Sequence, residues 1–226
     1  MLIAKGMIAL AATTLATGAA AQDVTSTQML AVSPDTQCEL HVWPAERFNA
    51  ITTGWLVALG PLGAVAEAAG NADKNKDHRT KIGAALDPQG QLDALTALDL
   101  TTSLGQQPAK IITHAEALDR KTINKISTRR AQSTSPCYSE LITADVMYQK
   151  AAIYGRSLRT LFLYRNFGSA QDKPKMYKAW GGNGLKLFPA KTGEDTQAAD
   201  AELVSVFKAN FQEFARNASK KALASK

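Results

Sequence analysis

The sequence predicts an α/β fold, in the α+β sense of a single domain with one mixed sheet. Two runs rich in β-branched and aromatic residues, 138–153 and 156–167, meet at Tyr154-Gly155 and predict a long antiparallel hairpin. Elsewhere, apolar residues at helical spacing alternate with short strand-like segments, so three or four helices should pack on the sheet. The two cysteines, Cys38 and Cys137, predict one disulfide.

The first 21 residues predict a cleavable signal peptide. Lys5 precedes an apolar run that starts at Met7, and Ala19-Ala20-Ala21 stands ahead of Gln22, which are the three parts of such a signal. The run is too short for a membrane span, and the residue after the predicted cut is not a cysteine, so we expect neither an anchor nor a lipid attachment. The expected localisation is periplasmic or secreted, where an oxidising environment lets cysteines pair.

Residues 22–36 predict a flexible segment, because they are polar, show no period and contain Ser33-Pro34-Asp35. Residues 37–226 then form the single exported domain. The chain of 226 residues is basic, with a net charge of +6, and is long enough to bury a substantial core. A disulfide between Cys38 and Cys137 closes a loop of about 100 residues, for which the chain-entropy model gives about 4–5 kcal/mol.

The domain should begin with a short strand and continue with helices. Residues 38–43 alternate between two faces, with Glu39, His41 and Trp43 sharing one of them. Pro44 suits the first turn of a helix that runs to Gly60-Pro61. This helix would carry apolar residues at helical spacing, namely Phe48, Ile51, Trp55 and Leu59. A second helical piece, 62–69, and an exposed polar loop, 70–78, are expected to follow.

The middle of the chain predicts a helix, a buried strand and a basic connection. A helix should open at 87–90 and present leucines on one stripe until Gly105. Residues 110–114 then predict a buried strand, and 120–130 a short helix followed by a solvated loop. After the hairpin, 180–184 predicts a glycine-rich turn ahead of an edge strand at 185–188, and a final amphipathic helix should start near Asp195.

The order from Leu92 onward resembles a known group of envelope domains. A leucine-striped helix, Gly105, the strand Lys110-Ile111-Ile112-Thr113-His114, a helical stretch up to Arg120 and the long hairpin follow one another. This order is similar to the small periplasmic α/β domain of curli-secretion pore lipoproteins and penicillin-binding-protein activator lipoproteins. The resemblance implies binding and assembly in the envelope rather than catalysis, and it assigns no functional residues. The lipoprotein cysteine of that group is absent here.

Basic and aromatic residues concentrate between Tyr148 and Trp180, which favours binding of an anionic ligand. The candidate ligand-binding residues are Arg156, Arg159, Arg165, Lys173 and Lys175. In a cytoplasmic protein the mixture would suggest nucleic acid, but export argues against that partner. The same positive surface would attract anionic envelope polymers, anionic lipids and acidic protein surfaces. The structural alternative is that the rings form the core and the cations a solvated rim.

Residues 50–66 carry no charge and include Trp55, so they predict either core packing or contact with a membrane or a partner subunit. Gly60-Pro61 interrupts the segment, and its length falls short of a spanning helix.

Metal and catalytic motifs are weak. Residues 73–77 match the first ligand positions of a calcium loop, but His78 stands where glycine is needed, so no metal or other cofactor is predicted. We assign no catalytic residues. The enzyme alternative is a site assembled from distant residues, with His41, His114 and an acid such as Asp145 as its candidates.

Three functional hypotheses therefore stay open. The first is a non-enzymatic cell-envelope protein that binds an anionic envelope component or an envelope protein. The second is a periplasmic hydrolase with the dispersed site. The third is a subunit of an oligomer that makes peripheral membrane contact through residues 50–66.

Overall fold

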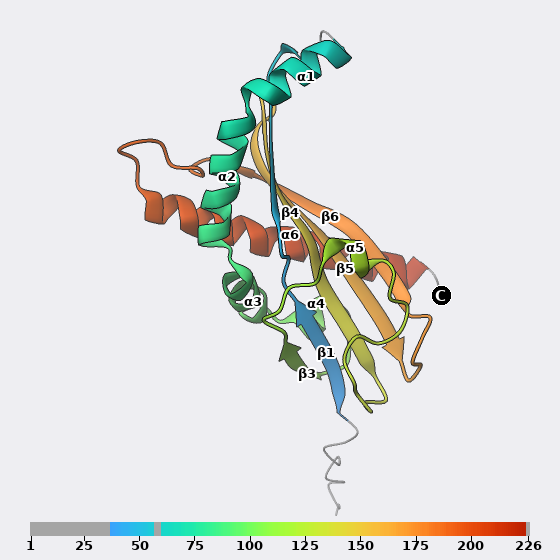
Figure 1. The fold of residues 1–226 in the computed structure, drawn as a ribbon. Helices are drawn as coiled ribbons and strands as arrows, with labels where there is room; N and C mark the ends of the chain where they lie inside the picture. The colour runs from blue at the N-terminus through green and yellow to red at the C-terminus, as the bar shows by residue number, and fades with distance from the viewer. Residues whose placement is uncertain (1–36, 57–59, 225–226) are drawn as a thin grey trace, which may run out of the picture. The chain divides into compact units, whose positions relative to one another are not determined.

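The computed structural model describes residues 37–56 and 60–224, in which one mixed α/β sheet is packed by helices (Figure 1). The predicted signal peptide, 1–21, and the segment 22–36 lie outside the described residues. The strands are β1 (Cys38–Trp43), β2 (Phe48–Thr53), β3 (Ala109–Thr113), β4 (Tyr138–Ala151), β5 (Gly155–Gly168) and β6 (Lys175–Leu185). The helices are α1 (Pro61–Gly70), α2 (Ala72–Ala85), α3 (Pro88–Thr96), α4 (Leu100–Ser103), α5 (Arg120–Ile123) and α6 (Thr196–Ala224).

Strand β4 organises the sheet, whose order is β3-β1-β4-β5-β6. Its first half pairs in parallel with β1 and its second half with β2, while β5 pairs antiparallel along its whole length. The predicted hairpin is therefore confirmed. The Cys38–Cys137 disulfide is also confirmed and ties the starts of β1 and β4, with the two Cα atoms 4.7 Å apart.

The main core lies between α6 and one face of the sheet. Strand residues such as Leu40 and Phe162 point to this face because side chains alternate along a strand. The predicted amphipathic helix supplies Leu203, Phe207, Phe211 and Phe214, all fully buried. In Figure 1, α6 passes behind the sheet and α5 lies in front of it.

The opposite face is covered by α5 and irregular chain rather than by a long helix. A smaller apolar cluster there joins Ile123 of α5 to Trp43, Ile142, Leu161 and Leu163 of the sheet. Beside this cluster lies a buried carboxylate, Glu140, which accepts hydrogen bonds from Arg165 Nη1 (2.9 Å), Tyr138 Oη (3.0 Å) and the backbone N–H of Arg130 (2.8 Å). The Arg130 guanidinium adds an ion pair at 3.7 Å.

The helix predicted from Pro44 to Gly60 is wrong, because residues 48–53 form strand β2. Phe48 and Ala50 face the core, whereas Ile51 faces away, so the burial has period two. The apolar residues of this stretch fit a helical period as well, and pairing with β4 decides between the two structures.

The polar loop predicted at 70–78 is also wrong, because most of it belongs to α2. This stretch has no internal proline, and Lys81 pairs with Asp77 one turn earlier at 2.9 Å. Ile82 is the buried apolar residue of α2, and His78 stacks at an angle on Tyr148 of β4.

Two further strand predictions need correction. Residues 110–114 were expected to be buried, but β3 lies at an edge of the described sheet and exposes Lys110, Ile111 and Thr113. The predicted turn at 180–184 lies inside β6, where Gly181 sits directly against the backbone of Asn210 in α6. A glycine here lets the helix approach the strand closely.

Glu140→Ala should lower the free energy of unfolding by about 3–5 kcal/mol, because it leaves the buried Arg165 and Arg130 without their counter-charge. Urea unfolding measures the change. Glu46→Ala, which removes an exposed carboxylate, is the control and should change the stability by less than about 0.5 kcal/mol. Equal, small losses in both variants would contradict the assigned role of Glu140.

Gly181→Ala should cost at least about 2 kcal/mol, because the added Cβ would collide with the Asn210 carbonyl group. Gly184→Ala is a matched control in the same strand, since its Cβ would meet only the Arg156 carbonyl oxygen at 3.8 Å. Thermal unfolding of the two variants should therefore separate them clearly. Similar melting temperatures would refute the close approach of α6 to β6.

Candidate functional site

A cavity of about 700 Å³ opens beside the disulfide, on the α6 side of the sheet. Its lining comes from the starts of β1, β4 and β6, the end of β5, the turn after α4, and the last part of α6. Gly105 has a φ of 64° and ends α4, which turns the chain so that Gln106 enters the cavity wall. Residues more than 100 positions apart thus line one hollow.

The polar groups of this cavity are already organised by hydrogen bonds. The Gln106 side-chain amide donates to the Tyr164 hydroxyl, and the Ser139 hydroxyl contacts Gln106 Oε1 at 3.4 Å. Burial raises the pKa of Tyr164 to about 12, so its hydroxyl stays protonated at neutral pH. The wall therefore presents fixed neutral dipoles, while Leu104, Met176 and Ala218 add apolar surface.

Two lysines give this cavity its charge. Lys175 comes from the start of β6, and Lys221 comes from α6, where its ammonium lies 5.6 Å from the centre of the Tyr177 ring. The residues that line the cavity include no Asp or Glu. The hollow is thus suited to an anionic group attached to a partly apolar body.

The five candidate ligand-binding residues do not share one surface. Lys175 lines the cavity, whereas Lys173 is exposed in the turn before β6 and has a φ of 55°. Arg159 lies over Trp180 on the opposite face of the sheet, 5.2 Å from the ring centre. Arg156 donates to the backbone carbonyl groups of Lys186, Leu187 and Pro189, and so it fastens the chain that follows β6.

Arg165 is 1% exposed and ion-paired with Glu140, so it belongs to the protein interior. Tyr148, Phe162, Tyr164 and Phe167 are buried too. The structural alternative therefore holds for these four rings, which belong to the core, whereas Arg165 is a buried ion-pair partner and not part of a solvated rim.

His41 of β1 and His114, the residue after β3, meet on the face opposite the cavity. His41 Nδ1 lies 2.8 Å from His114 Nε2, and His41 Nε2 lies 3.1 Å from Glu39 Oε2. The Ser133 hydroxyl donates to the same Glu39 oxygen. His114 also stacks on Trp43 with ring centres 4.1 Å apart.

This chain of groups has a defined proton arrangement when both rings are neutral. If His41 Nε2–H donates to Glu39, then His41 Nδ1 accepts from His114 Nε2–H, which leaves His114 Nδ1 as an acceptor. Burial tends to raise the pKa of Glu39, but hydrogen bonds from Ser133 and His41 outweigh it and hold that pKa below its usual value.

Asp145, the acid proposed for the enzyme alternative, does not complete this chain. Its Oδ1 accepts a 2.7 Å hydrogen bond from Asn49 of β2, whereas Glu39 is the acid beside His41. A second cavity, of about 440 Å³, lies near Arg47 and Arg79. Neither His41 nor His114 lines this cavity or the one beside the disulfide.

Metal binding and membrane spanning find no support in the described residues. Across 37–56 and 60–224, no three or more His, Cys, Asp or Glu side chains gather in a way that could hold a metal ion. Within the same ranges, none of the helices combines the length and apolar character needed to cross a bilayer.

Sequence reasoning missed most of the cavity. The strand alternation placed Glu39 and His41 on one face, and this signal identifies part of the histidine chain. Gln106, Tyr164 and Lys221 carry no comparable local signal, because three separate elements bring them together.

No protein-family model matches this chain, and neither does any curated protein. A solved structure of an uncharacterized protein is similar at 11% sequence identity, over 85% of this chain and 95% of that chain, with a TM-score of 0.23. A similarity this low supports no inference about function.

The free energy of unfolding should fall as the pH drops below 6.5. Burial lowers the pKa of both His78 and His114, and the charge of His41 adds to the effect on His114. The unfolded chain therefore binds more protons than the folded one between the usual pKa of 6.5 and the lowered values, and stability is lost across that window.

Urea unfolding at a series of pH values tests this expectation. His78→Phe and His114→Phe should each flatten the dependence, and the double variant should flatten it most. An unchanged slope in the double variant would contradict the assignment.

Proposed function

We propose that this protein is a non-enzymatic cell-envelope protein that binds an anionic envelope component in the cavity between α6 and the sheet. The proposal rests on one observation: Lys175 and Lys221 both line a cavity whose lining residues include no Asp or Glu. This arrangement favours anion binding, because a nearby carboxylate would offset the attraction.

The chemistry of the lining narrows the ligand class. Amide, hydroxyl and ammonium groups recognise phosphate or carboxylate oxygens, while Leu104, Met176 and the disulfide contact apolar parts of the same molecule. Phospholipids and lipopolysaccharide have this character, because they join phosphate groups to apolar acyl chains, whereas acidic cell-wall polymers supply the anionic groups alone. We infer that the ligand is an amphipathic anion with a phosphate or carboxylate group.

The cellular setting of the proposal rests on the sequence. Residues 1–21 have the pattern of an export signal, and the confirmed disulfide fits an oxidising compartment. A periplasmic or secreted location makes nucleic acid an implausible partner and leaves envelope polymers, lipids and proteins. The resemblance to periplasmic lipoprotein domains stays a prediction and agrees with a binding role.

The hydrolase alternative has one observation in its favour, the hydrogen-bonded chain Glu39–His41–His114. A general base acts on a substrate held within hydrogen-bond reach. The cavity and the histidine chain lie on opposite faces of the sheet, so a ligand in the cavity does not reach His114. The geometry thus favours binding over hydrolysis.

Lys175→Glu combined with Lys221→Glu should weaken binding of monomeric dihexanoyl phosphatidylglycerol at least about tenfold, because two attractive charges become repulsive. Titration calorimetry below the micelle concentration measures the affinity, and dihexanoyl phosphatidylcholine is the neutral comparison. Changing Arg165 would be a poorer test, since its substitution disturbs the interior.

The matched control is Lys121→Glu combined with Lys125→Glu, which changes the net charge equally at exposed positions outside the cavity lining. It should retain the wild-type affinity. Equal weakening in both double variants, or no binding by the wild-type protein, would overturn the cavity as the anion site.

A further inference from the structure

The most exposed apolar side chains of the described residues gather at one end of the molecule. Trp55 is 71% exposed, Leu62 and Val65 of α1 are 85% and 69% exposed, and Ile153 and Tyr154 of the β4–β5 turn are each 88% exposed. We call Trp55, α1 and the turn 152–154 the apolar tip. Isolated exposed apolar residues are normal, but a cluster of this size marks an interaction surface.

Helix α1 exposes its apolar face to the solvent and buries its charged residue, which is the opposite of the usual arrangement in a water-soluble protein. Leu62, Val65, Ala66 and Ala69 follow the spacing of one helical stripe, and all four are exposed. Glu67, the only ionisable residue of α1, is instead buried beside Gly54. A helix normally buries its apolar stripe and exposes its charge, so the opposite arrangement calls for an apolar medium outside.

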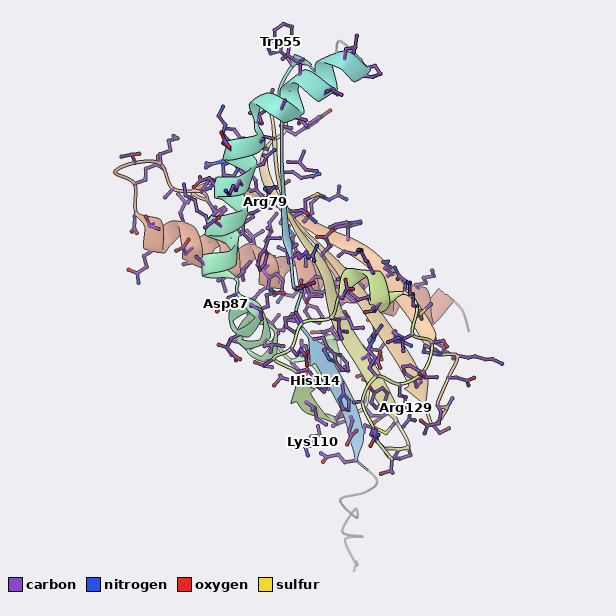
Figure 2. The ribbon with its side chains drawn as sticks, in the orientation of Figure 1. Trp55, Arg79, Asp87, Lys110, His114 and Arg129 are labelled. Carbon is purple, nitrogen blue, oxygen red and sulfur yellow. A yellow bond between two sulfur atoms is a disulfide. The ribbon has the colours of Figure 1, made fainter. Side chains whose placement is uncertain are left out.

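The parts of the tip are held together by a backbone hydrogen bond and by a side-chain contact. The backbone N–H of Ala152 donates to the Thr53 carbonyl group at 3.1 Å, which places the hairpin turn beside the end of β2. Trp55 follows two residues later, and Gly54 contacts α1 through Glu67. Figure 2 shows Trp55 at the end of the molecule occupied by α1, with His114 toward the opposite end.

The surroundings of the tip are basic. Lys150 stands at the end of β4, opposite Arg156 at the start of β5. The Arg156 guanidinium is held by backbone carbonyl groups of the chain after β6 and lies near the charges of Glu194 and Glu202, so Lys150 is the cation of this pair that faces the tip without such partners among the described contacts. No acid occurs in the sequence from 146 to 171 or from 47 to 66. On α2 the acids Asp73 and Asp77 are matched by Lys74 and Lys76. An apolar tip next to Lys150 and to α2, where Arg79 and Lys81 are in excess of the acids, is complementary to a surface with an apolar interior and anionic head groups.

We propose that the apolar tip docks on a lipid bilayer that contains anionic lipids, with α1 lying in the interface. Trp55 and Tyr154 suit this position because their rings have an apolar body and a polar atom that stays hydrated. A ten-residue helix is about 15 Å long, too small by itself to supply the roughly 800 Å² per partner of a stable protein interface. A bilayer sets no such minimum area.

This inference is independent of the cavity, because β4 carries the two sites at its opposite ends. The test uses the oxidised protein that begins at Gln22, so that residues 1–21 do not contribute to lipid binding. Flotation with phosphatidylcholine vesicles, with and without phosphatidylglycerol, measures the bound fraction. The wild-type protein should bind the vesicles that contain phosphatidylglycerol more strongly.

The triple variant Trp55→Ser, Leu62→Ser, Ile153→Ser should reduce vesicle binding at least about tenfold, because it removes three side chains that enter the interface. Ile111→Ser, Ile126→Ser, Leu187→Ser is the matched control, since these residues are also exposed but lie outside the tip. Circular dichroism should report the same fold for both. The tip variant should still bind monomeric dihexanoyl phosphatidylglycerol, and the cavity variant should still bind vesicles.

Trp55 fluorescence gives a second readout. The emission should shift to shorter wavelength when vesicles are added, and Trp55→Phe should abolish the shift, because Trp43 is buried and Trp180 is half-buried. Equal vesicle binding by the tip variant and the control would overturn the proposal. Dimerisation that the tip variant abolishes, without vesicle binding by the wild-type protein, would also overturn it and assign the tip to a second copy of the chain.

Discussion

The buried carboxylate of Glu140 is the constraint on which the second face of the sheet depends. A charge that is fully removed from water must be paired and hydrogen-bonded, and Arg165, Arg130 and Tyr138 do this together. Arg130 belongs to the irregular chain that covers this face, so the pairing holds that chain in place. Neighbouring Arg129 adds hydrogen bonds to four backbone carbonyl groups, of Ser133, Ser135, Gly168 and Ala170.

The same strand positions build the proposed ligand site. Side chains alternate along a strand, so Ser139 and Tyr164 point into the cavity while their neighbours Glu140 and Arg165 form the ion pair behind them. The buried ion pair therefore lies directly behind the strand positions that line the cavity. At the other end of β4, a strand of 14 residues and thus about 45 Å long, stands the apolar tip. A tip in the bilayer interface would leave the cavity accessible from the aqueous side.

Prediction from the sequence failed where a local pattern allowed two structures. Phe48, Ile51 and Trp55 satisfy a helical period, yet parallel pairing with β4, about 100 residues later, makes this stretch a strand. Helix α2 was missed because its polar sequence has one buried apolar residue, Ile82, and no stripe. Gly181 and its neighbours indicated a turn, but they lie in β6 because α6 needs room there. Core packing was one prediction for residues 50–66, yet Trp55 and Leu62 are exposed.

The sequence by itself determined the α/β class, the hairpin, the disulfide, the first strand and the final helix. Each rests on a signal within one segment, such as the alternation of residues 38–43 or the phenylalanine stripe of α6, and the disulfide on there being two cysteines. Only the tertiary structure decided which cations share a site. Lys175 and Lys221 line the same cavity because β6 and the end of α6 lie side by side. Arg165 instead forms a buried ion pair with Glu140. Contacts between distant segments have no local period, and so no pattern within a segment reports them.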